Sequence, residues 1–393
     1  MRKVLIAGAV RTPIGSMNGV FAGVRAVDLG VTAAREVLRR TGVDPNLIEE
    51  AILGNVLQAG QGQNPARQVA LGAGLPETVP AFTVNKVCGS GLKAIDLGWQ
   101  SIALGRADVV LAGGMECMSQ APYLLPSMRA GARMGDAKAV DGMIFDGLWE
   151  IFNNYHMGLT AENVAAQYGI TRQEQDQFAF RSQQKCGEAI RAGRFQSEIT
   201  PVHIKLKKGE TVIEADEHPR PDTSLEKMAA LRPAFKPDGT VTAGNASGIN
   251  DGAAAVLLVA EDAVPAGLCL DGAVRLIDVR SSGCNPAVMG LGPIGAVRRL
   301  LEKTGLGVED IDLWELNEAF ASQSIACIRE LGFDTARVNV NGGAIALGHP
   351  IGCTGARVTT TLIHEMKRRD ARRGVAAMCI GGGMGIAGLV ERV

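Results

Sequence analysis

A glycine-rich turn that opens a helix occurs twice, as Cys88-Gly89-Ser90-Gly91-Leu92-Lys93-Ala94 and as Gly352-Cys353-Thr354-Gly355-Ala356-Arg357-Val358. A second pair of stretches follows the same order. VVLAGGME from Val109 and AMCIGGGMG from Ala377 both read as a buried strand that runs into glycines. Because the two motifs recur in the same order in both halves of the chain, we infer a duplicated α/β unit.

Short β-branched strands alternate with helical patterns around these stretches. In the first half we expect strands at 4–9, 50–56 and 108–112, and helices at 26–40 and 92–104. In the last third we expect strands at 273–279, 313–316 and 375–380, and helices at 294–303, 319–331 and 355–368. This βαβ rhythm predicts an α/β fold with a mostly parallel sheet covered by helices on both faces.

The region between the halves, from Cys117 to Asn245, is rich in Met, Pro and charge and has less strand rhythm. It contains an expected amphipathic helix from Thr171 to Arg191, capped by Thr171 with Glu174 three residues later. Stretches 204–210 and 211–215 predict a small hairpin, and a strand at 253–259 returns to the first half. The predicted division is 1–117 with 246–270, an inserted loop domain at 118–245, and 271–393. An insertion of this kind is suited to specificity and contacts.

Composition excludes several classes of protein. The 393 residues are 46% hydrophobic and 21% charged, and the net charge of −1 argues against a nucleic-acid surface or a polybasic membrane patch. No apolar run reaches the length of a bilayer span, and the short run Val4–Val10 reads as a strand rather than a signal peptide. The eight cysteines stand singly, so we expect reduced thiols and a cytoplasmic location.

Two of the candidate catalytic residues are Cys88 and His349. Cys88 is expected at a helix N-terminus, where free backbone N–H groups and the helix dipole favour an anion and lower the pKa of a thiol. His349 lies in the glycine-dense stretch 341–352 and could deprotonate Cys88 or donate to an oxyanion. A packed cysteine and a structural histidine are the alternatives.

Two further candidates end predicted strands. Cys379 is followed by Gly381-Gly382-Gly383, at the strand edge where open α/β sheets place their sites. These glycines could turn backbone N–H groups toward a ligand as an oxyanion hole. Asn317 lies where a strand gives way to a helix, so it could also be a simple N-cap. For Cys379 the alternative is a small buried residue.

Segments 85–94, 317–321, 341–357 and 379–387, taken together and in this order, closely resemble the four signature blocks of the thiolase family. VRTPIG from Val10 and GGMECMSQAPY from Gly113 resemble further thiolase segments. The resemblance covers essentially the whole chain. It implies a layered αβαβα fold of two similar halves with mixed sheets and an inserted loop domain.

The resemblance also implies roles. Cys88 is the nucleophile that becomes acylated, and His349 is the base that activates it and later helps to hold the thioester oxygen. Cys379 moves a proton at the α-carbon of the second acyl group. Asn317 holds a water that forms one oxyanion hole with His349, and the backbone N–H groups of Cys88 and Gly381 form the other. The implied reaction is a ping-pong Claisen condensation of two acetyl-CoA to acetoacetyl-CoA and CoA, and its reversal, without metal or redox cofactor.

Tyr155-His156-Met157-Gly158 resembles the segment of short-chain thiolases, in which the Met narrows the acyl pocket. Ala243 to Gly248 resembles a pantetheine-binding loop. The implied contacts with the CoA thioester are Leu148, His156, Met157, Arg220, Phe235, Ala243, Ser247, Met289 and Phe320. Arg220 is assigned to the adenosine phosphates, with a solvated surface charge as the alternative.

The segment Ala121–Asp141, with Arg133-Met134-Gly135-Asp136, resembles the region that holds thiolase dimers together as tetramers. Three other functions are open. A broader 3-ketoacyl-CoA thiolase of fatty-acid β-oxidation, also in lipid metabolism, is disfavoured by Met157. A decarboxylating condensing enzyme is disfavoured by Cys379, because that class uses two histidines. An inactive lipid carrier or scaffold is disfavoured because all four chemical positions are intact.

Overall fold

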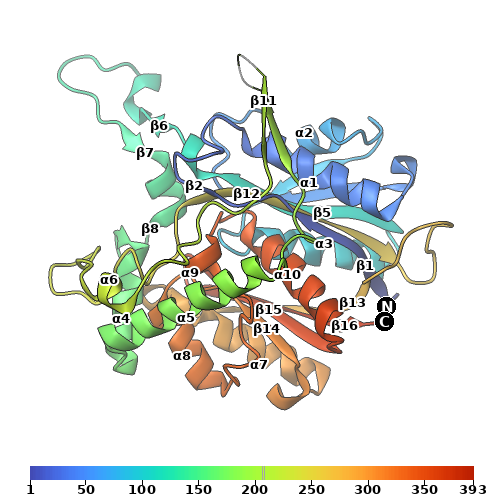
Figure 1. Ribbon diagram of the computed structural model, residues 1–393. Helices are drawn as coiled ribbons and strands as arrows, with labels where there is room; N and C mark the ends of the chain where they lie inside the picture. The colour runs from blue at the N-terminus through green and yellow to red at the C-terminus, as the bar shows by residue number, and fades with distance from the viewer. Residues whose placement is uncertain (206, 208) are drawn as a thin grey trace.

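The computed structural model describes residues 1–205, 207 and 209–393, and one ten-stranded sheet runs through it (Figure 1). The strands follow the order β14-β15-β16-β13-β1-β12-β5-β3-β4, and the short β2 pairs with β12. Their bounds are β1 (Val4–Arg11), β2 (Gly15–Ser16), β3 (Glu50–Gly54), β4 (Ala81–Val84), β5 (Val109–Cys117), β12 (Asn250–Ala260), β13 (Val274–Gly283), β14 (Leu313–Leu316), β15 (Arg373–Ile380) and β16 (Met384–Arg392). The two halves of the sheet join where β1 pairs with β13.

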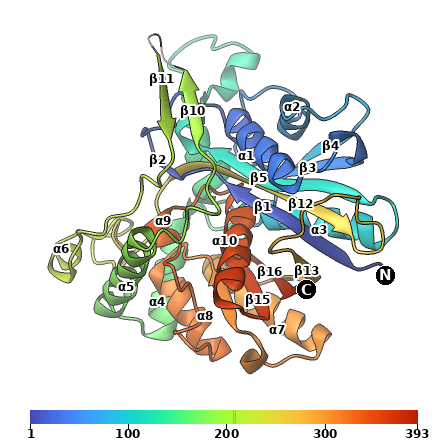
Figure 2. The ribbon, with the colours of Figure 1, turned by 45° about the vertical axis from the view of Figure 1, so that its right-hand side comes forward.

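Helices form three layers around the two halves of the sheet (Figures 1 and 2). The outer face of the first half is covered by α1 (Ala26–Thr41) and α2 (Pro65–Gly72), and that of the second half by α7 (Gly292–Thr304) and α8 (Ala321–Leu331). Between the halves lie α3 (Ser90–Ala103) and α10 (Thr354–Arg369). This arrangement confirms the layered α/β fold.

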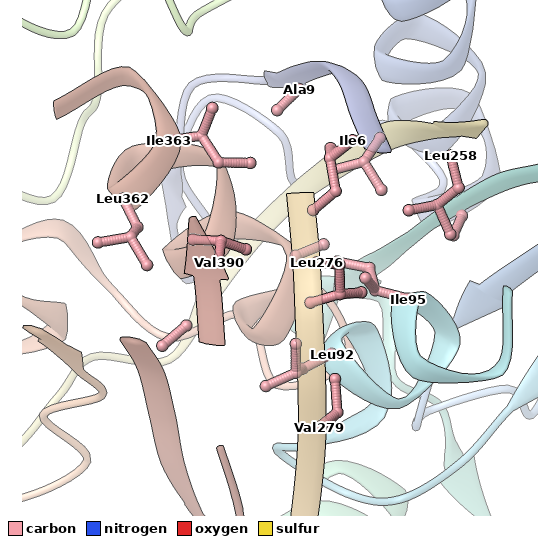
Figure 3. Packing of buried hydrophobic residues seen from close by; sticks show 14 of the residues in the cluster. Ile6, Ala9, Leu92, Ile95, Leu258, Leu276, Val279, Leu362, Ile363 and Val390 are labelled. Atoms are coloured by element: carbon pink, nitrogen blue, oxygen red, sulfur yellow. The ribbon is translucent and has the colours of Figure 1, made fainter. Parts of the chain in front are cut away.

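Successive side chains of a strand point to opposite faces of the sheet. Because helices cover both faces, the strands are buried on both. On β1, Leu5 packs in the outer cluster with α1, whereas Ile6 packs in the central cluster with α3 and α10. Figure 3 shows this central cluster, in which Leu92 of α3 and Leu362 of α10 lie near Leu276 of β13. Burial on both faces explains why the strands read as apolar runs rather than as alternating patterns.

The two halves repeat one topology, which confirms the predicted duplication. The order β3-β5-β12-β1 in the first half matches β14-β15-β16-β13 in the second, and each has one parallel pair followed by two antiparallel pairs. The matched glycine-rich turns open α3 and α10, and these helices meet at their first turns. A Cβ on Gly91 would lie 2.6 Å from the backbone nitrogen of Ala356, and one on Gly355 would lie 2.1 Å from that of Leu92.

The expectation of a mostly parallel sheet is wrong. Among the strands that the structure describes, only the pairs β3–β4, β3–β5 and β14–β15 are parallel, and the strands between them pair antiparallel. A parallel crossover needs a dozen or more residues. The run Gly381-Gly382-Gly383 joins β15 to β16 directly as a hairpin, and Gly382 and Gly383 have φ values of 83° and 81° that favour glycine.

The insertion contains short strands and helices that surround one end of the layers. They are β6 (Tyr123–Leu124), β7 (Val140–Asp141), β8 (Trp149–Glu150), β9 (Tyr155–His156), α4 (Met157–Tyr168), α5 (Arg172–Arg191), β10 (Val202–Lys205), β11 (Glu210–Ile213) and α6 (Leu225–Ala229). The capping box of Thr171 and Glu174 is confirmed at α5. The predicted hairpin is confirmed as β10–β11, and residues 206 and 208 of its predicted first strand lie outside the described residues. Strand β12 then pairs with β1 and β5, as expected.

One short helix, α9 (Ala344–Leu347), precedes α10 in the glycine-dense stretch. In the part of the chain that the structure describes, each helix is too short or too polar to cross a lipid bilayer.

Candidate active site

Cys88 lies in the loop that joins β4 to α3. Helix α3 begins at Ser90 with Gly89 at the N-cap, so the cysteine precedes the helix rather than standing in its first turn. The residue before it, Val87, has a φ of 46°, which is rare for a β-branched side chain. The Ser90 hydroxyl donates to the Val87 carbonyl (2.7 Å) and accepts from the Lys86 N–H (2.8 Å), which holds this turn.

The electrostatics of Cys88 differ from the expectation. Burial raises the pKa of the thiol to about 11, although the backbone N–H groups of Gly381 and of Cys88 itself act to lower it. The charge of Glu116 adds to the rise. The predicted fall in the pKa is therefore wrong for the free protein, because desolvation outweighs the two N–H groups.

Cys379 is the last residue but one of β15 and is fully buried. Burial raises its pKa well above the ordinary value, and the nearby charge of Cys88 raises it further. It belongs to an apolar cluster with Met157, Met289 and Phe320. Two residues further on, the N–H of Gly381 points to the Cys88 sulfur. The end of β15 thus brings a second thiol and a backbone donor to Cys88.

His349 lies in the loop between α9 and α10 and is 5% exposed. Three polar groups fix it. Its N–H donates to Oδ1 of Asn250 (2.9 Å), its Nδ1 lies 2.6 Å from Oγ1 of Thr354, and its Nε2 lies 3.5 Å from Nδ2 of Asn317. Burial, and then the charge of Arg357, lower its pKa to about 3, so the imidazole is neutral at ordinary pH.

Asn317 is not a helix cap. Helix α8 begins at Ala321 with Phe320 at its N-cap. The Asn317 N–H donates to the Ala377 carbonyl (2.9 Å), which fixes the residue beside the end of β15, and its side chain faces His349. The structure thus favours a role at the site for Asn317.

A cavity of about 230 Å³ opens onto Cys88, His349 and Gly381. Most of the predicted substrate contacts line it: Leu148, His156, Met157, Phe235, Ala243, Ser247, Met289 and Phe320. Cys379 and Asn317 are buried just outside the lining. Residues from both halves and from the insertion therefore meet at one site.

Aromatic rings form one wall of the cavity. Phe235 stacks on His156 with ring centroids 4.7 Å apart and meets Phe320 edge-on at 6.3 Å. His156 accepts the Gly158 N–H at Nδ1 (3.0 Å) and so caps α4, and burial lowers its pKa. The wall is uncharged and mainly apolar, as is usual for a pocket that binds a small molecule.

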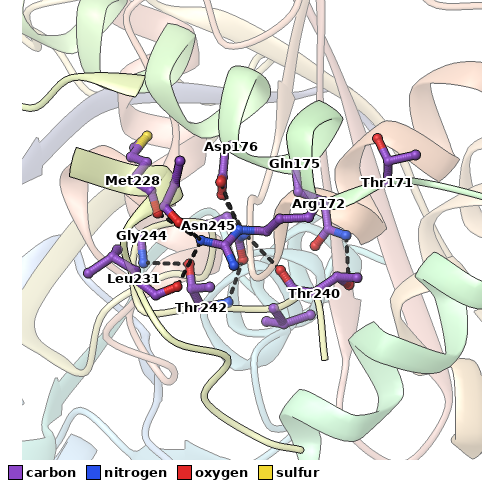
Figure 4. A network of polar contacts seen from close by, with 12 residues as sticks. Thr171, Arg172, Gln175, Asp176, Met228, Leu231, Thr240, Thr242, Gly244 and Asn245 are labelled. Atoms are coloured by element: carbon purple, nitrogen blue, oxygen red, sulfur yellow. Dashed lines mark hydrogen bonds and ion pairs between the residues drawn. The ribbon is translucent and has the colours of Figure 1, made fainter. Parts of the chain in front are cut away.

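The loop 242–248, which carries Ala243 and Ser247, is fixed from two sides. Its Ser247 N–H donates to the Ala319 carbonyl (3.0 Å). On the other side, Asn245 donates to Asp176 of α5 (2.9 Å), and Arg172 donates to the same carboxylate (2.7 Å) (Figure 4). Helix α5 therefore positions one wall of the cavity.

Arg220 lies outside the cavity. It is exposed, and its guanidinium donates to the carbonyls of Glu217, His218 and Pro219 in its own loop. The structure does not bring this residue to the other predicted contacts, and it agrees with the alternative of a surface charge.

Sequence reasoning missed three polar residues beside the catalytic candidates. Thr354 and Asn250 bond His349, and the buried carboxylate of Glu116 accepts from Gly352 (2.9 Å) and Val56 (3.0 Å). A signal existed for two of them. Glu116 is a charge inside an apolar strand, and Thr354 follows His349 by five residues at a helix start. No feature of the neighbouring sequence identifies Asn250 as a residue of the site.

Comparison with known proteins agrees with this geometry. The thiolase N-terminal domain model matches residues 4–262, and the thiolase C-terminal domain model matches residues 270–392. The chain is 58% identical over 388 residues to a protein of Pseudomonas aeruginosa named acetyl-CoA acetyltransferase, with 98% of both chains covered.

Two solved structures are similar over the whole chain. The acetyl-CoA acetyltransferase of Bacillus anthracis has a TM-score of 0.97 at 45% identity, and human mitochondrial 3-ketoacyl-CoA thiolase has a TM-score of 0.96 at 44% identity. These matches cover 100% of this chain and 99% of the first structure. With both domain models matched in order over a site of two thiols and a histidine, the chain belongs to the thiolase family.

Proposed function

We propose that this protein is an acetyl-CoA C-acetyltransferase, which condenses two acetyl-CoA to acetoacetyl-CoA and CoA and catalyses the reverse thiolysis. The observation that carries the proposal is the cavity on which Cys88, His349 and the Gly381 N–H converge, with Cys379 buried beside it. The name of the Pseudomonas aeruginosa relative supports the same activity.

In the first half-reaction, the Cys88 sulfur attacks the thioester carbonyl of acetyl-CoA. The new bond joins Cys88 to the acetyl carbon, the bond from that carbon to the CoA sulfur breaks, and the Cys88 proton passes through His349 Nε2 to the leaving CoA sulfur. Because the pKa of Cys88 is about 11 and that of His349 about 3, complete transfer before attack is unfavourable. The proton therefore moves as the sulfur–carbon bond forms.

In the second half-reaction, the Cys379 thiol gives its proton to His349 Nε2, and the thiolate so formed takes an α-proton from a second acetyl-CoA. The resulting carbanion attacks the acetyl carbon on Cys88, a carbon–carbon bond forms, and Cys88 leaves as a thiolate. The proton on His349 then passes to the Cys88 thiolate, so both thiols and the imidazole return to their neutral forms. The N–H groups of Cys88 and Gly381 would stabilise the oxyanion at the acyl-cysteine, and each such donor is typically worth about 3 kcal/mol.

The enolate oxygen of the second thioester needs its own donors. We assign these to His349 and to a water held by Asn317. The buried Oδ1 of Asn317, which has no hydrogen-bond partner among the described residues, fits that assignment.

The proposal that the acyl group is short is based on the residues that form the walls of the cavity. Met157, Met289 and Phe320 pack around Cys379, where the α-carbon must approach, and leave a cavity of about 230 Å³. The alternative is a broader 3-ketoacyl-CoA thiolase, and the similar human mitochondrial structure bears that name. Thiolysis rates measured with C4, C8 and longer 3-ketoacyl-CoA decide between them: a steep fall beyond C4 supports the proposal.

We also propose that the protein is a cytoplasmic homo-oligomer, a tetramer built from dimers. The inserted segment exposes an unusual number of large apolar side chains: Tyr123, Leu125, Met128, Met134, Phe145, Ile151 and Phe152. Exposed apolar patches of this kind mark interaction surfaces. Sedimentation equilibrium of the purified protein tests the stoichiometry.

Two variants test the division of labour between the thiols. Cys88→Ala should lose both exchange of labelled CoA into acetyl-CoA and condensation. Cys379→Ala should keep the CoA exchange, which uses Cys88 and His349 but not Cys379, and lose condensation. Loss of both reactions in a folded Cys379→Ala protein, or their retention in Cys88→Ala, would contradict the assigned roles.

A further inference from the structure

Thr354 lies against His349, the histidine assigned to proton transfer. It is fully buried at the first position of α10, and its Oγ1 lies 2.6 Å from Nδ1 of His349. The same hydroxyl donates to the Pro350 carbonyl at 2.9 Å. The histidine backbone is held separately, by Asn250. A side chain that bonds the far nitrogen of a catalytic imidazole is placed to control its proton.

The hydrogen-bonding inventory assigns the tautomer. A hydroxyl has one proton and two lone pairs, and a carbonyl can only accept. Because the Thr354 proton lies on the Pro350 carbonyl, the hydroxyl accepts at its other contact, and Nδ1 of His349 must donate. The nitrogen that faces Asn317 Nδ2 is then unprotonated, and that amide group is itself a donor. Both neighbours of the ring therefore favour the Nδ1–H tautomer.

We propose that Thr354 is a positioning residue that holds His349 in the Nδ1–H tautomer, so that Nε2 is free to take the Cys88 proton. This inference rests on the proposed function. A neutral hydroxyl also differs from a carboxylate in this place, because it orients the ring without a negative charge that would retain the proton on the imidazolium. The proton can then pass on to the leaving CoA sulfur.

The chain offers a matched control on the same helix. Thr360 is fully buried, and its hydroxyl donates to the carbonyl four residues earlier, Ala356, at 2.9 Å. Thr354 makes the same bond to Pro350, but Thr360 has no contact with His349. Thr354→Val and Thr360→Val thus lose the same helical hydrogen bond, and only the first loses the bond to the imidazole.

The experiment measures the rate constant of acetyl transfer from acetyl-CoA to Cys88 by rapid quench, with thermal stability recorded for each variant. Thr354→Val should slow the transfer at least about tenfold with little change in KM, since general-base assistance is worth about 10²–10⁴-fold. Thr354→Ser should restore most of the rate, and Thr360→Val should keep it. Equal rates for Thr354→Val and wild type, or equal losses in both valine variants, would overturn the proposal.

A spectroscopic readout is independent of rate. In protein labelled with ¹⁵N-histidine, the signals absent from His349→Asn should report the Nδ1-protonated neutral tautomer in wild type and a different tautomer population in Thr354→Val. An Nε2-protonated ring in the wild-type protein would refute the inference. These outcomes leave the proposed function standing as long as wild type acetylates and Cys88→Ala does not.

Discussion

At the scale of single residues, the site is governed by burial. Cys88, Cys379 and His349 are all held in their neutral forms in the free protein, because desolvation raises the pKa of both thiols and lowers that of the imidazole. A neutral nucleophile is protected from unwanted electrophiles until a thioester fills the cavity. The N–H groups of Cys88 and Gly381 then serve the reacting oxygen.

The raised pKa of Cys88 predicts a pH dependence. Below a pKa of about 11 the thiol form dominates, so the thiolate fraction, and with it the rate of alkylation by iodoacetamide, should rise roughly tenfold per pH unit from neutral pH upward. Peptide mapping identifies alkylation at Cys88, with Cys88→Ala as the blank. If the rate of alkylation instead reached a plateau near pH 8, the two N–H groups would lower the pKa of Cys88 by more than burial raises it.

The sequence predicted which residues form the site better than it predicted their electrostatics. Resemblance to thiolases named Cys88, His349 and Cys379, and the cavity holds the first two with the third beside it. The sign of the thiol pKa shift was missed, because burial depends on packing from several distant segments. The role of Arg220 stays a prediction, because its guanidinium lies at the surface against its own loop and nothing in the local sequence shows where an exposed side chain turns.

At the scale of elements, α5 controls the substrate wall through Asp176. This carboxylate accepts from Arg172 on its own helix and from Asn245 on the loop that carries Ala243 and Ser247. The helix and its capping box were predictable from periodicity and from Thr171 with Glu174. The contact with the loop was not, because the two residues are 69 positions apart.

Asp176→Ala should loosen this loop. It removes the carboxylate that accepts from the buried amide of Asn245 and from the partly exposed Arg172, and a buried donor without its acceptor costs about 1–3 kcal/mol. We expect the KM for acetyl-CoA to rise more than kcat falls. The matched control is Glu330→Ala, which removes an exposed ion pair with Arg298 and should change neither constant, because such pairs contribute little. A variant with lower kcat and unchanged KM would place Asp176 outside substrate binding.

At the scale of the whole molecule, the contact of α3 with α10 brings the catalytic loops together. Cys88 precedes α3 and His349 precedes α10, and the two helices meet through Gly91 and Gly355. The sequence predicted the duplication through these turns. It did not predict the antiparallel centre of the sheet, because the glycine hairpin between β15 and β16 read only as the end of a strand.

Gly355→Ala tests this contact. Its Cβ would lie 2.1 Å from the Leu92 nitrogen, and since this neighbour is backbone the helices must separate. We expect a loss of about 3 kcal/mol in the free energy of unfolding and a larger loss of activity. Gly23→Ala, at an exposed position with nothing within 4 Å, should stay within about 0.5 kcal/mol of wild type. Equal stability of both variants in urea titrations would contradict the close approach.

The central claim is that Cys88 carries the acyl group, and mass spectrometry of the protein tests it most directly. After incubation with acetyl-CoA, the account predicts one acetyl adduct on the peptide that contains Cys88, and its disappearance when free CoA is added. An adduct on another residue, or an acetyl group that CoA cannot remove, would contradict the account.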